Sequence, residues 1–188
     1  MLRYLVAYAS REGQTEKIAH RMARRLEDSG ELVRLIDIKG QESEAGADEY
    51  DAMIVSGSVH RGEFDPELSR FIIRHGEALR RTPSAFVCVS LSAASHEASE
   101  RSAIDEIAQR FIAEHGWMPD LVHHVAGAVH DRRLNALERV ILHTIVDSKG
   151  VERHPSGSTE LTDWADVDAF VRSFEALTES KISGPTPA

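Results

Sequence analysis

The fold of this chain is decided by the stretch Ala7-Tyr8-Ala9-Ser10-Arg11-Glu12-Gly13-Gln14-Thr15. An apolar run, residues 4–9, leads into this stretch, and a pattern of helical period, residues 16–26, follows it. Such an order predicts a strand, a tight loop and a helix at the start of an α/β fold. A loop in this position points its backbone N–H groups outward from a helix N-terminus, where the helix dipole also favours negative charge. The stretch therefore predicts an anion site.

The residue types in the loop at residues 10–15 indicate which kind of phosphate could bind there. The loop has neither the G-x-x-x-x-G-K-S/T pattern of triphosphate loops nor the G-x-G-x-x-G pattern of dinucleotide sites. Gly13 permits a tight turn because glycine tolerates positive φ, and Ser10 and Thr15 add hydroxyl donors. These features suit a single terminal phosphate such as that of FMN. The alternative is an ordinary strand-to-helix turn that binds nothing.

Length, charge and cysteine content limit the class of protein. The chain has 188 residues, 41% of them hydrophobic, which fits one domain with a substantial core. Its net charge of -9 disfavours nucleic acid and anionic membrane surfaces as partners of the whole body. The single cysteine, Cys88, excludes an internal disulfide, fits a reducing compartment and lies in an apolar run that predicts burial. With no signal-peptide pattern and no long apolar run, we expect a cytoplasmic protein without a spanning helix.

Alternating patterns along the chain predict the secondary structure. Strands are expected at residues 3–9, 32–38, 52–59, 84–91 and 121–129. Helices are expected at residues 15–29, 66–80, 98–115 and 163–178. The second helix has Asp65 at its cap and Pro66 at its first position. This alternation predicts a doubly wound, five-stranded parallel sheet of order 2-1-3-4-5 in one domain, residues 1–178, with a disordered tail at 179–188.

Ligands of such sheets bind at the carboxyl ends of the strands, where the strand order reverses. The loops after strands one, three and four meet at this edge, and all three are rich in Ser, Gly and other small residues. The expected cofactor-binding residues are Ser10, Arg11, Glu12, Gly13, Gln14, Thr15, Ser58, Val59, His60, Arg61, Gly62, Ser90, Leu91, Ser92 and Ala93.

A long segment, about residues 130–160, separates strand five from the last helix and exceeds an ordinary connection. Leu137, Ile141 and Ile145 share one face of a helical pattern within it. The segment follows the fifth strand onto the rim that carries the other loops. It therefore predicts either a cover over the ligand or a helix that packs on the core.

Metal chemistry finds little support in the sequence. His123 and His124 are adjacent in a predicted strand, so their side chains point to opposite faces and cannot chelate one ion together. No second pair has zinc-like spacing, and no metal is expected.

Several stretches resemble the flavodoxin-like proteins and, within them, the bacterial menaquinone-dependent protoporphyrinogen dehydrogenases. The resemblance covers the chain to about Leu177. The matching stretches are Ser10-Arg11-Glu12-Gly13-Gln14-Thr15, Gly57-Ser58-Val59 with Gly62 and Phe64, Thr82-Pro83-Ser84-Ala85-Phe86, Gly116-Trp117-Met118-Pro119-Asp120, Ala126-Gly127-Ala128 and Thr162-Asp163-Trp164. That group also carries a long segment after strand five.

This resemblance implies FMN as cofactor and the oxidation of protoporphyrinogen, or of another small aromatic substrate, with a quinone as electron acceptor in haem biosynthesis. His60 is a candidate proton relay, because a histidine beside the flavin can pass protons near neutral pH. Arg61, Arg132 and Arg133 are candidate partners of substrate carboxylates, and ordinary surface arginines are the alternative.

Two other functions fit the same predicted FMN site: a different FMN quinone reductase, and an electron carrier without a substrate of its own. The acidic charge favours the carrier, whereas the long segment argues against it. At most, peripheral contact with the inner face of the cell membrane is expected. The sequence leaves the oligomeric state open, a homo-oligomer included.

Overall fold

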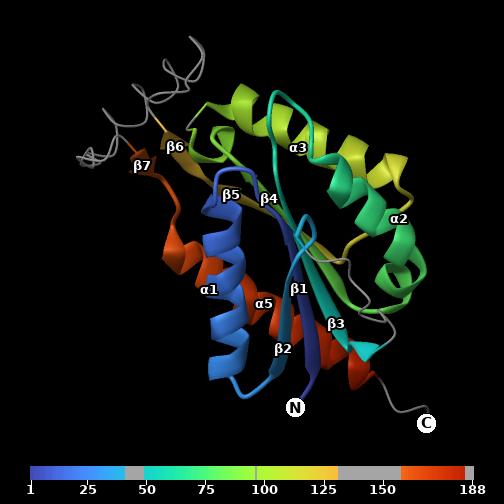
Figure 1. The fold of residues 1–188 in the computed structure, drawn as a ribbon. Helices are drawn as coiled ribbons and strands as arrows, with labels where there is room; N and C mark the ends of the chain where they lie inside the picture. The colour runs from blue at the N-terminus through green and yellow to red at the C-terminus, as the bar shows by residue number, and fades with distance from the viewer. Residues whose placement is uncertain (41–48, 96, 131–157, 185–188) are drawn as a thin grey trace.

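The computed structural model describes residues 1–40, 49–95, 97–130 and 158–184 of the chain. In this part of the chain a five-stranded parallel sheet has the order β2-β1-β3-β4-β5 (Figure 1). Its strands are β1 (Arg3–Ala9), β2 (Leu32–Asp37), β3 (Ala52–Ser58), β4 (Ser84–Ser90) and β5 (Leu121–Ala126). The predicted fold class and strand order are confirmed.

Helices cover both faces of the sheet, with α1 and α5 on one face and α2 and α3 on the other (Figure 1). Their bounds are α1 (Gln14–Asp28), α2 (Pro66–Arg81), α3 (Ala98–Glu114) and α5 (Trp164–Ile182). Helix α5 runs to Ile182 instead of ending at Thr178, so the predicted tail begins too early. Within the described ranges, no helix combines the length and the apolar character needed to cross a membrane.

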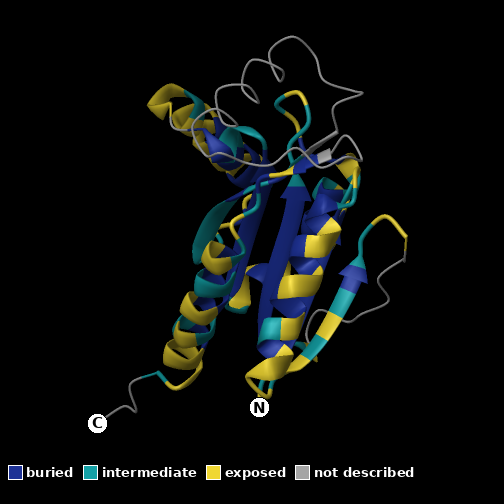
Figure 2. Ribbon diagram, turned by 90° about the vertical axis from the view of Figure 1, so that its left-hand side faces the viewer, coloured by how far each residue is buried: buried dark blue, intermediate teal, exposed yellow. Residues whose placement is uncertain are grey.

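Two apolar cores form because successive side chains of a strand point to opposite faces. Leu5 and Ala7 of β1 pack in the core under α2 and α3, whereas Tyr4 and Val6 pack in the core under α1 and α5. Figure 2 shows the result, central strands that are buried between helices exposed on their outer faces, with the edge strand β2 more exposed. This two-sided burial fixes the sheet and leaves its carboxyl edge to carry the loops.

The predicted fifth strand, residues 121–129, is wrong in its second half, because the chain leaves the parallel sheet at Gly127. The Gly127 N–H donates to the Ser90 carbonyl at 3.1 Å, and its own carbonyl accepts from Leu161 N at 3.0 Å. Beyond it, β6 (Ala128–His130) pairs antiparallel with β7 (Ser158–Glu160). A Cβ at Gly127 would come within 3.3 Å of Val89 Cγ1, so the residue is placed where a side chain fits poorly.

The adjacent histidines of β5 point to opposite faces, as predicted. His123 Nε2 lies 2.9 Å from Asp166 Oδ2 on α5, and His124 Nε2 lies 3.3 Å from Asp105 Oδ1 on α3. Among the described residues, no group of three or more His, Cys, Asp or Glu is arranged to hold a metal ion. Cys88 is fully buried, and its burial raises the pKa of the thiol.

The middle of the predicted insert, residues 131–157, lies outside the described residues. The helical pattern predicted there, and the substrate candidates Arg132 and Arg133, therefore remain predictions.

Candidate functional site

The loop after β1 begins helix α1 in the manner that an anion site requires. Gly13 is the N-cap with φ +89°, and α1 has no side-chain cap on its first turn. The Gly13 N–H donates to Ser10 Oγ at 3.0 Å, which closes the loop. The N–H groups of the first helical turn have no partner within a helix, so they remain available to a ligand.

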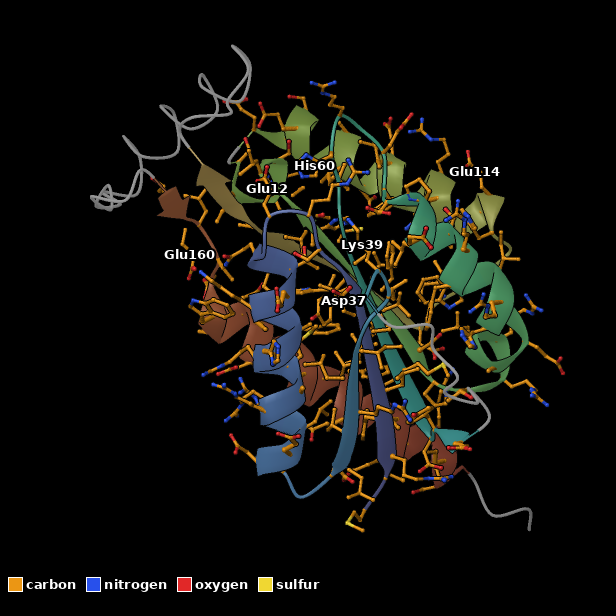
Figure 3. The ribbon with its side chains drawn as sticks, viewed as in Figure 1. Glu12, Asp37, Lys39, His60, Glu114 and Glu160 are labelled. Carbon is orange, nitrogen blue, oxygen red and sulfur yellow. The ribbon has the colours of Figure 1, made fainter. Side chains whose placement is uncertain are left out.

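Two of the predicted loop residues are buried at the start of α1. Gln14 donates through Nε2 to Thr162 Oγ1 at 2.8 Å, and Thr162 Oγ1 donates to the Ala126 carbonyl at 2.7 Å. The Gln14 side chain therefore ties α1 to the end of β5, a structural role that its type alone did not reveal. Thr15 is only 2% exposed and stands on the same turn. Glu12 is exposed and lies at the same end of the sheet as His60 (Figure 3).

The loop after β3 makes a tight turn that presents one arginine. His60 N donates to the Glu63 carbonyl at 2.8 Å, and Glu63 N donates to the His60 carbonyl at 3.1 Å. Between them, Arg61 has φ +52° and Gly62 has φ +82°. Positive φ at both central positions is the signature of a type I′ turn, which Gly62 adopts freely and Arg61 does not. The Arg61 side chain is exposed at the tip.

The loop after β4 is closed by its own serine. Ser90 Oγ accepts the Ala93 N–H at 3.1 Å, and the chain makes a short 3-10 turn, η2 (Ser92–Ala94). Val59 N donates to the Val89 carbonyl at 2.9 Å, so the loops after β3 and β4 leave the sheet side by side. The structure thus brings the predicted loop residues of β1, β3 and β4 to one edge.

One buried group at this edge lacks a partner. Ser58 Oγ is inaccessible and makes no hydrogen bond with the described residues. A buried hydroxyl without a partner costs free energy unless a ligand or water satisfies it. Ser58 ends β3, next to the loop that carries His60 and Arg61.

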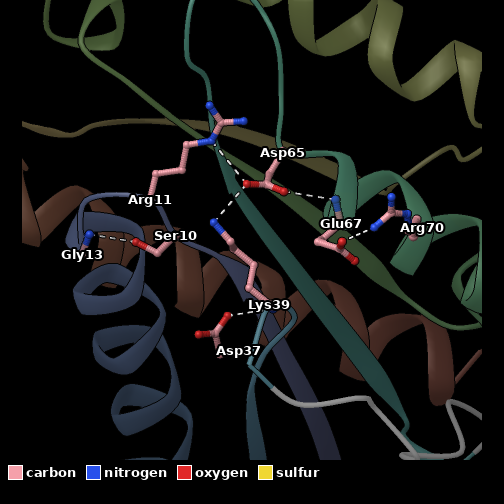
Figure 4. A network of polar contacts seen from close by, with 8 residues as sticks. All are labelled: Ser10, Arg11, Gly13, Asp37, Lys39, Asp65, Glu67 and Arg70. Atoms are coloured by element: carbon pink, nitrogen blue, oxygen red, sulfur yellow. Dashed lines mark hydrogen bonds and ion pairs between the residues drawn. The ribbon is translucent and has the colours of Figure 1, made fainter.

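A carboxylate that sequence reasoning treated only as a helix cap lies at the centre of a polar network (Figure 4). Asp65 Oδ2 lies 3.2 Å from Arg11 Nε and 3.2 Å from Lys39 Nζ. Its other oxygen, Oδ1, accepts the Glu67 N–H at 3.1 Å. Burial opposes ionisation, but the Glu67 N–H, Lys39 and Arg11 outweigh it and hold the pKa of the Asp65 carboxyl below its usual value.

These residues fit FMN on the chemistry of their donors. The uncapped helix α1 and the Ser10 and Thr15 hydroxyls suit the terminal phosphate. The loops after β3 and β4 leave the sheet side by side, and residues 58–60 and 91–93 at their starts are half-buried. When bound, the flavin supplies the electron-transfer chemistry.

Comparison with known proteins agrees with this geometry. Residues 5–156 match the family model described as "Flavodoxin domain". The chain is 30% identical to a protoporphyrinogen IX dehydrogenase (quinone) of Leishmania major, over 92% of this chain and 74% of that protein. It is 27% identical to the protein of the same name from Escherichia coli strain K12, over 95% of this chain and 97% of that one.

Solved structures share the fold at low sequence identity. A flavodoxin from Pseudomonas aeruginosa superposes with a TM-score of 0.57 at 14% identity, over 95% of this chain and all of the other. The rubredoxin oxygen:oxidoreductase of Desulfovibrio gigas also gives 0.57, at 12% identity; the alignment covers 97% of this chain but only 37% of that protein. The chain therefore belongs to the flavodoxin domain family, whose cofactor is FMN, and within it to the group of its protoporphyrinogen IX dehydrogenase relatives.

Proposed function

We propose that this FMN oxidoreductase removes hydrogen from protoporphyrinogen and passes the electrons to a quinone. The observation that carries the proposal is the 30% identity to the Leishmania major protein of that name, which extends over 92% of this chain. An electron carrier would need only an exposed flavin edge, whereas this chain adds the β6–β7 pair at the carboxyl end of β5.

The chain's own residues would bind and orient the reactants. The first turn of α1, with Ser10 and Thr15, holds the phosphate, and the loops after β3 and β4 flank the ring on the same edge. His60, which is half-buried in the loop after β3 with its backbone fixed by Glu63, would relay a proton. Arg61 presents a guanidinium that suits a substrate carboxylate.

A direct assay separates the candidate functions. Purified protein loaded with FMN should convert protoporphyrinogen to fluorescent protoporphyrin only when a menaquinone analogue or another quinone is present. Quinone reduction from a different donor, without porphyrin formation, would instead identify a quinone reductase. If neither reaction occurs but the flavin exchanges electrons with a redox partner protein, the chain is a carrier.

Arg61 gives a residue-level prediction for this function. Its φ of +52° costs a non-glycine residue about 1 kcal/mol, yet its side chain makes no hydrogen bond or ion pair with the described residues. We therefore expect Arg61→Gly to raise the free energy of unfolding by at most roughly 0.5 kcal/mol, because relief of the strained φ is largely offset by the greater freedom of glycine in the unfolded chain. The same variant should raise KM for the porphyrinogen about tenfold or more, with kcat little changed, because a charge-assisted contact is lost.

Matched variants distinguish the side chain from the backbone. Arg61→Asn also tolerates positive φ and should reproduce the KM effect, whereas Arg61→Lys keeps the charge and should show a smaller one. Equal KM values for the parent and Arg61→Gly would mean that the arginine is solvated and plays no part in substrate binding.

A further inference from the structure

Asp65 differs from an ordinary helix cap in its burial and in the number of its partners. It caps α2 through Oδ1, which accepts the Glu67 N–H at 3.1 Å, and Pro66 follows at the first helical position. N-cap side chains need only this one contact. The residue is nevertheless only 7% exposed, and its second oxygen faces away from the helix toward the loops at the sheet edge (Figure 4).

The second oxygen, Asp65 Oδ2, forms ion pairs with cations from two other loops. Arg11 Nε approaches Asp65 Oδ2 to 3.2 Å from the loop after β1, and Lys39 Nζ approaches it to 3.2 Å from the turn after β2. The Lys39 turn is itself held, because Lys39 N donates to Asp37 Oδ1 at 2.9 Å. One carboxylate therefore joins the chain segments that follow β1, β2 and β3.

The contact between these three chain segments depends on the negative charge of Asp65. Arg11 and Lys39 both pair with this one carboxylate, and without Asp65 the two cations would repel each other across a short gap. Arg11 and Lys39 are exposed enough to move apart, with 39% and 37% of their side chains accessible. Arg11 lies in the loop that Ser10 Oγ and Gly13 N close, so its ion pair with Asp65 ties that loop to the start of α2.

We propose that Asp65 is a positioning residue for the cofactor: without touching FMN, it sets the loop after β1 against the loop after β3 at the separation that FMN binding requires. The inference rests on the assignment of Ser10–Thr15 to the FMN phosphate. It does not depend on which substrate the flavin oxidises.

The chain offers a matched control for the capping role. Asp163 caps α5 through Oδ1, which accepts from Ala165 N at 3.0 Å and Asp166 N at 3.1 Å. It makes no ion pair with the described residues. Asparagine caps helices about as well as aspartate, so Asp65→Asn and Asp163→Asn both keep a cap, and only Asp65→Asn removes a carboxylate from two cations.

The test is FMN affinity of the full-length apoprotein, measured by quenching of flavin fluorescence. We expect Asp65→Asn to raise the FMN dissociation constant about tenfold or more, the change of one charged contact, and Asp163→Asn to leave it within about twofold. The effect of Asp65→Asn should shrink when Arg11→Gln is already present, because the two residues act as one unit. Equal effects of the two Asp→Asn variants, or full additivity with Arg11→Gln and with Lys39→Gln, would make Asp65 a helix cap only.

Single variants at Arg11 and Lys39, and a comparison of FMN affinity with oxidation, complete the test. If Asp65→Asn does not fold, Arg11→Gln and Lys39→Gln alone must each weaken FMN binding severalfold, and unchanged affinity in both overturns the proposal. A variant that binds FMN normally yet lacks porphyrinogen oxidation would count against the proposed function, whereas lost FMN affinity with oxidation restored at saturating FMN supports the positioning role.

Discussion

Replacing Ser10 and Thr15 together by alanine should weaken FMN binding by roughly 2–3 kcal/mol, on the order of 30–150-fold. Each hydroxyl is placed at the start of α1, where the helix has no side-chain cap and its first N–H groups are free for an anion. Ser10 Oγ has a second role, because it accepts the Gly13 N–H and so fixes the loop. The measurement is a flavin fluorescence titration of the apoprotein.

Riboflavin, which lacks the phosphate, makes this test specific. If the two hydroxyls act on the phosphate, the double variant should lose most of the preference for FMN over riboflavin and bind riboflavin as the parent does. FAD, with its extended diphosphate, should bind less well than FMN throughout.

A control pair of the same residue types lies on α5. Ser173 Oγ and Thr178 Oγ1 each donate to a carbonyl of their own helix, at 3.0 Å and 2.8 Å, far along the chain from the loop. Ser173→Ala with Thr178→Ala should leave the FMN affinity within about twofold. An unchanged affinity in the Ser10/Thr15 variant as well would remove the phosphate role from this loop.

The sheet and its order followed from the sequence because the pattern was strong and local. The run from Tyr4 to Ala9 is buried on both faces, so it is apolar throughout, and the strand predicted at residues 3–9 coincides with β1. Asp65-Pro66 marked the start of α2 correctly, because a cap followed by proline is itself a local signal.

The failures arose where a residue's partners lie far away in sequence. Gly127 sits among apolar residues and so resembled the middle of a strand, whereas its N–H and carbonyl pair with Ser90 and Leu161. The Asp65 network needs Arg11 and Lys39 from two other loops, and their convergence depends on the strand order and on how each loop turns. The spacing of Arg11, Lys39 and Asp65 in the sequence therefore does not predict that their side chains are in contact.

Replacing residues 133–157 by a short Gly/Ser linker should abolish most porphyrinogen oxidation while leaving the fold and FMN binding intact. The segment lies outside the described residues, which resume on either side of 131–157 with β6 and β7. His130 pairs with Ser158 and Ala128 pairs with Glu160, so β6 and β7 hold the ends side by side, and a short linker can join them. The predicted phosphate loop and the loops after β3 and β4 do not depend on it.

The size of the expected loss follows from substrate positioning. Correct placement of a reactant can contribute up to about 7–11 kcal/mol of the barrier, so loss of a substrate-binding wall should lower kcat/KM by at least about 100-fold. In the sequence, Leu137, Ile141 and Ile145 share one face of a helical pattern, which would offer apolar area to a large flat ligand. A second variant that keeps residues 134–146 and replaces only 147–157 should retain much more activity.

Three measurements together decide between the readings of this segment: FMN affinity, thermal unfolding and quinone-dependent oxidation of protoporphyrinogen. Parent-like oxidation by the shortened protein would show that the segment does not position the substrate. Loss of cooperative unfolding would show that it belongs to the core, since a core helix leaves exposed apolar surface when it is removed. We expect retained FMN binding and stability with lost oxidation, because the predicted FMN site lies in the loops after β1, β3 and β4, whereas the segment begins and ends beyond β5.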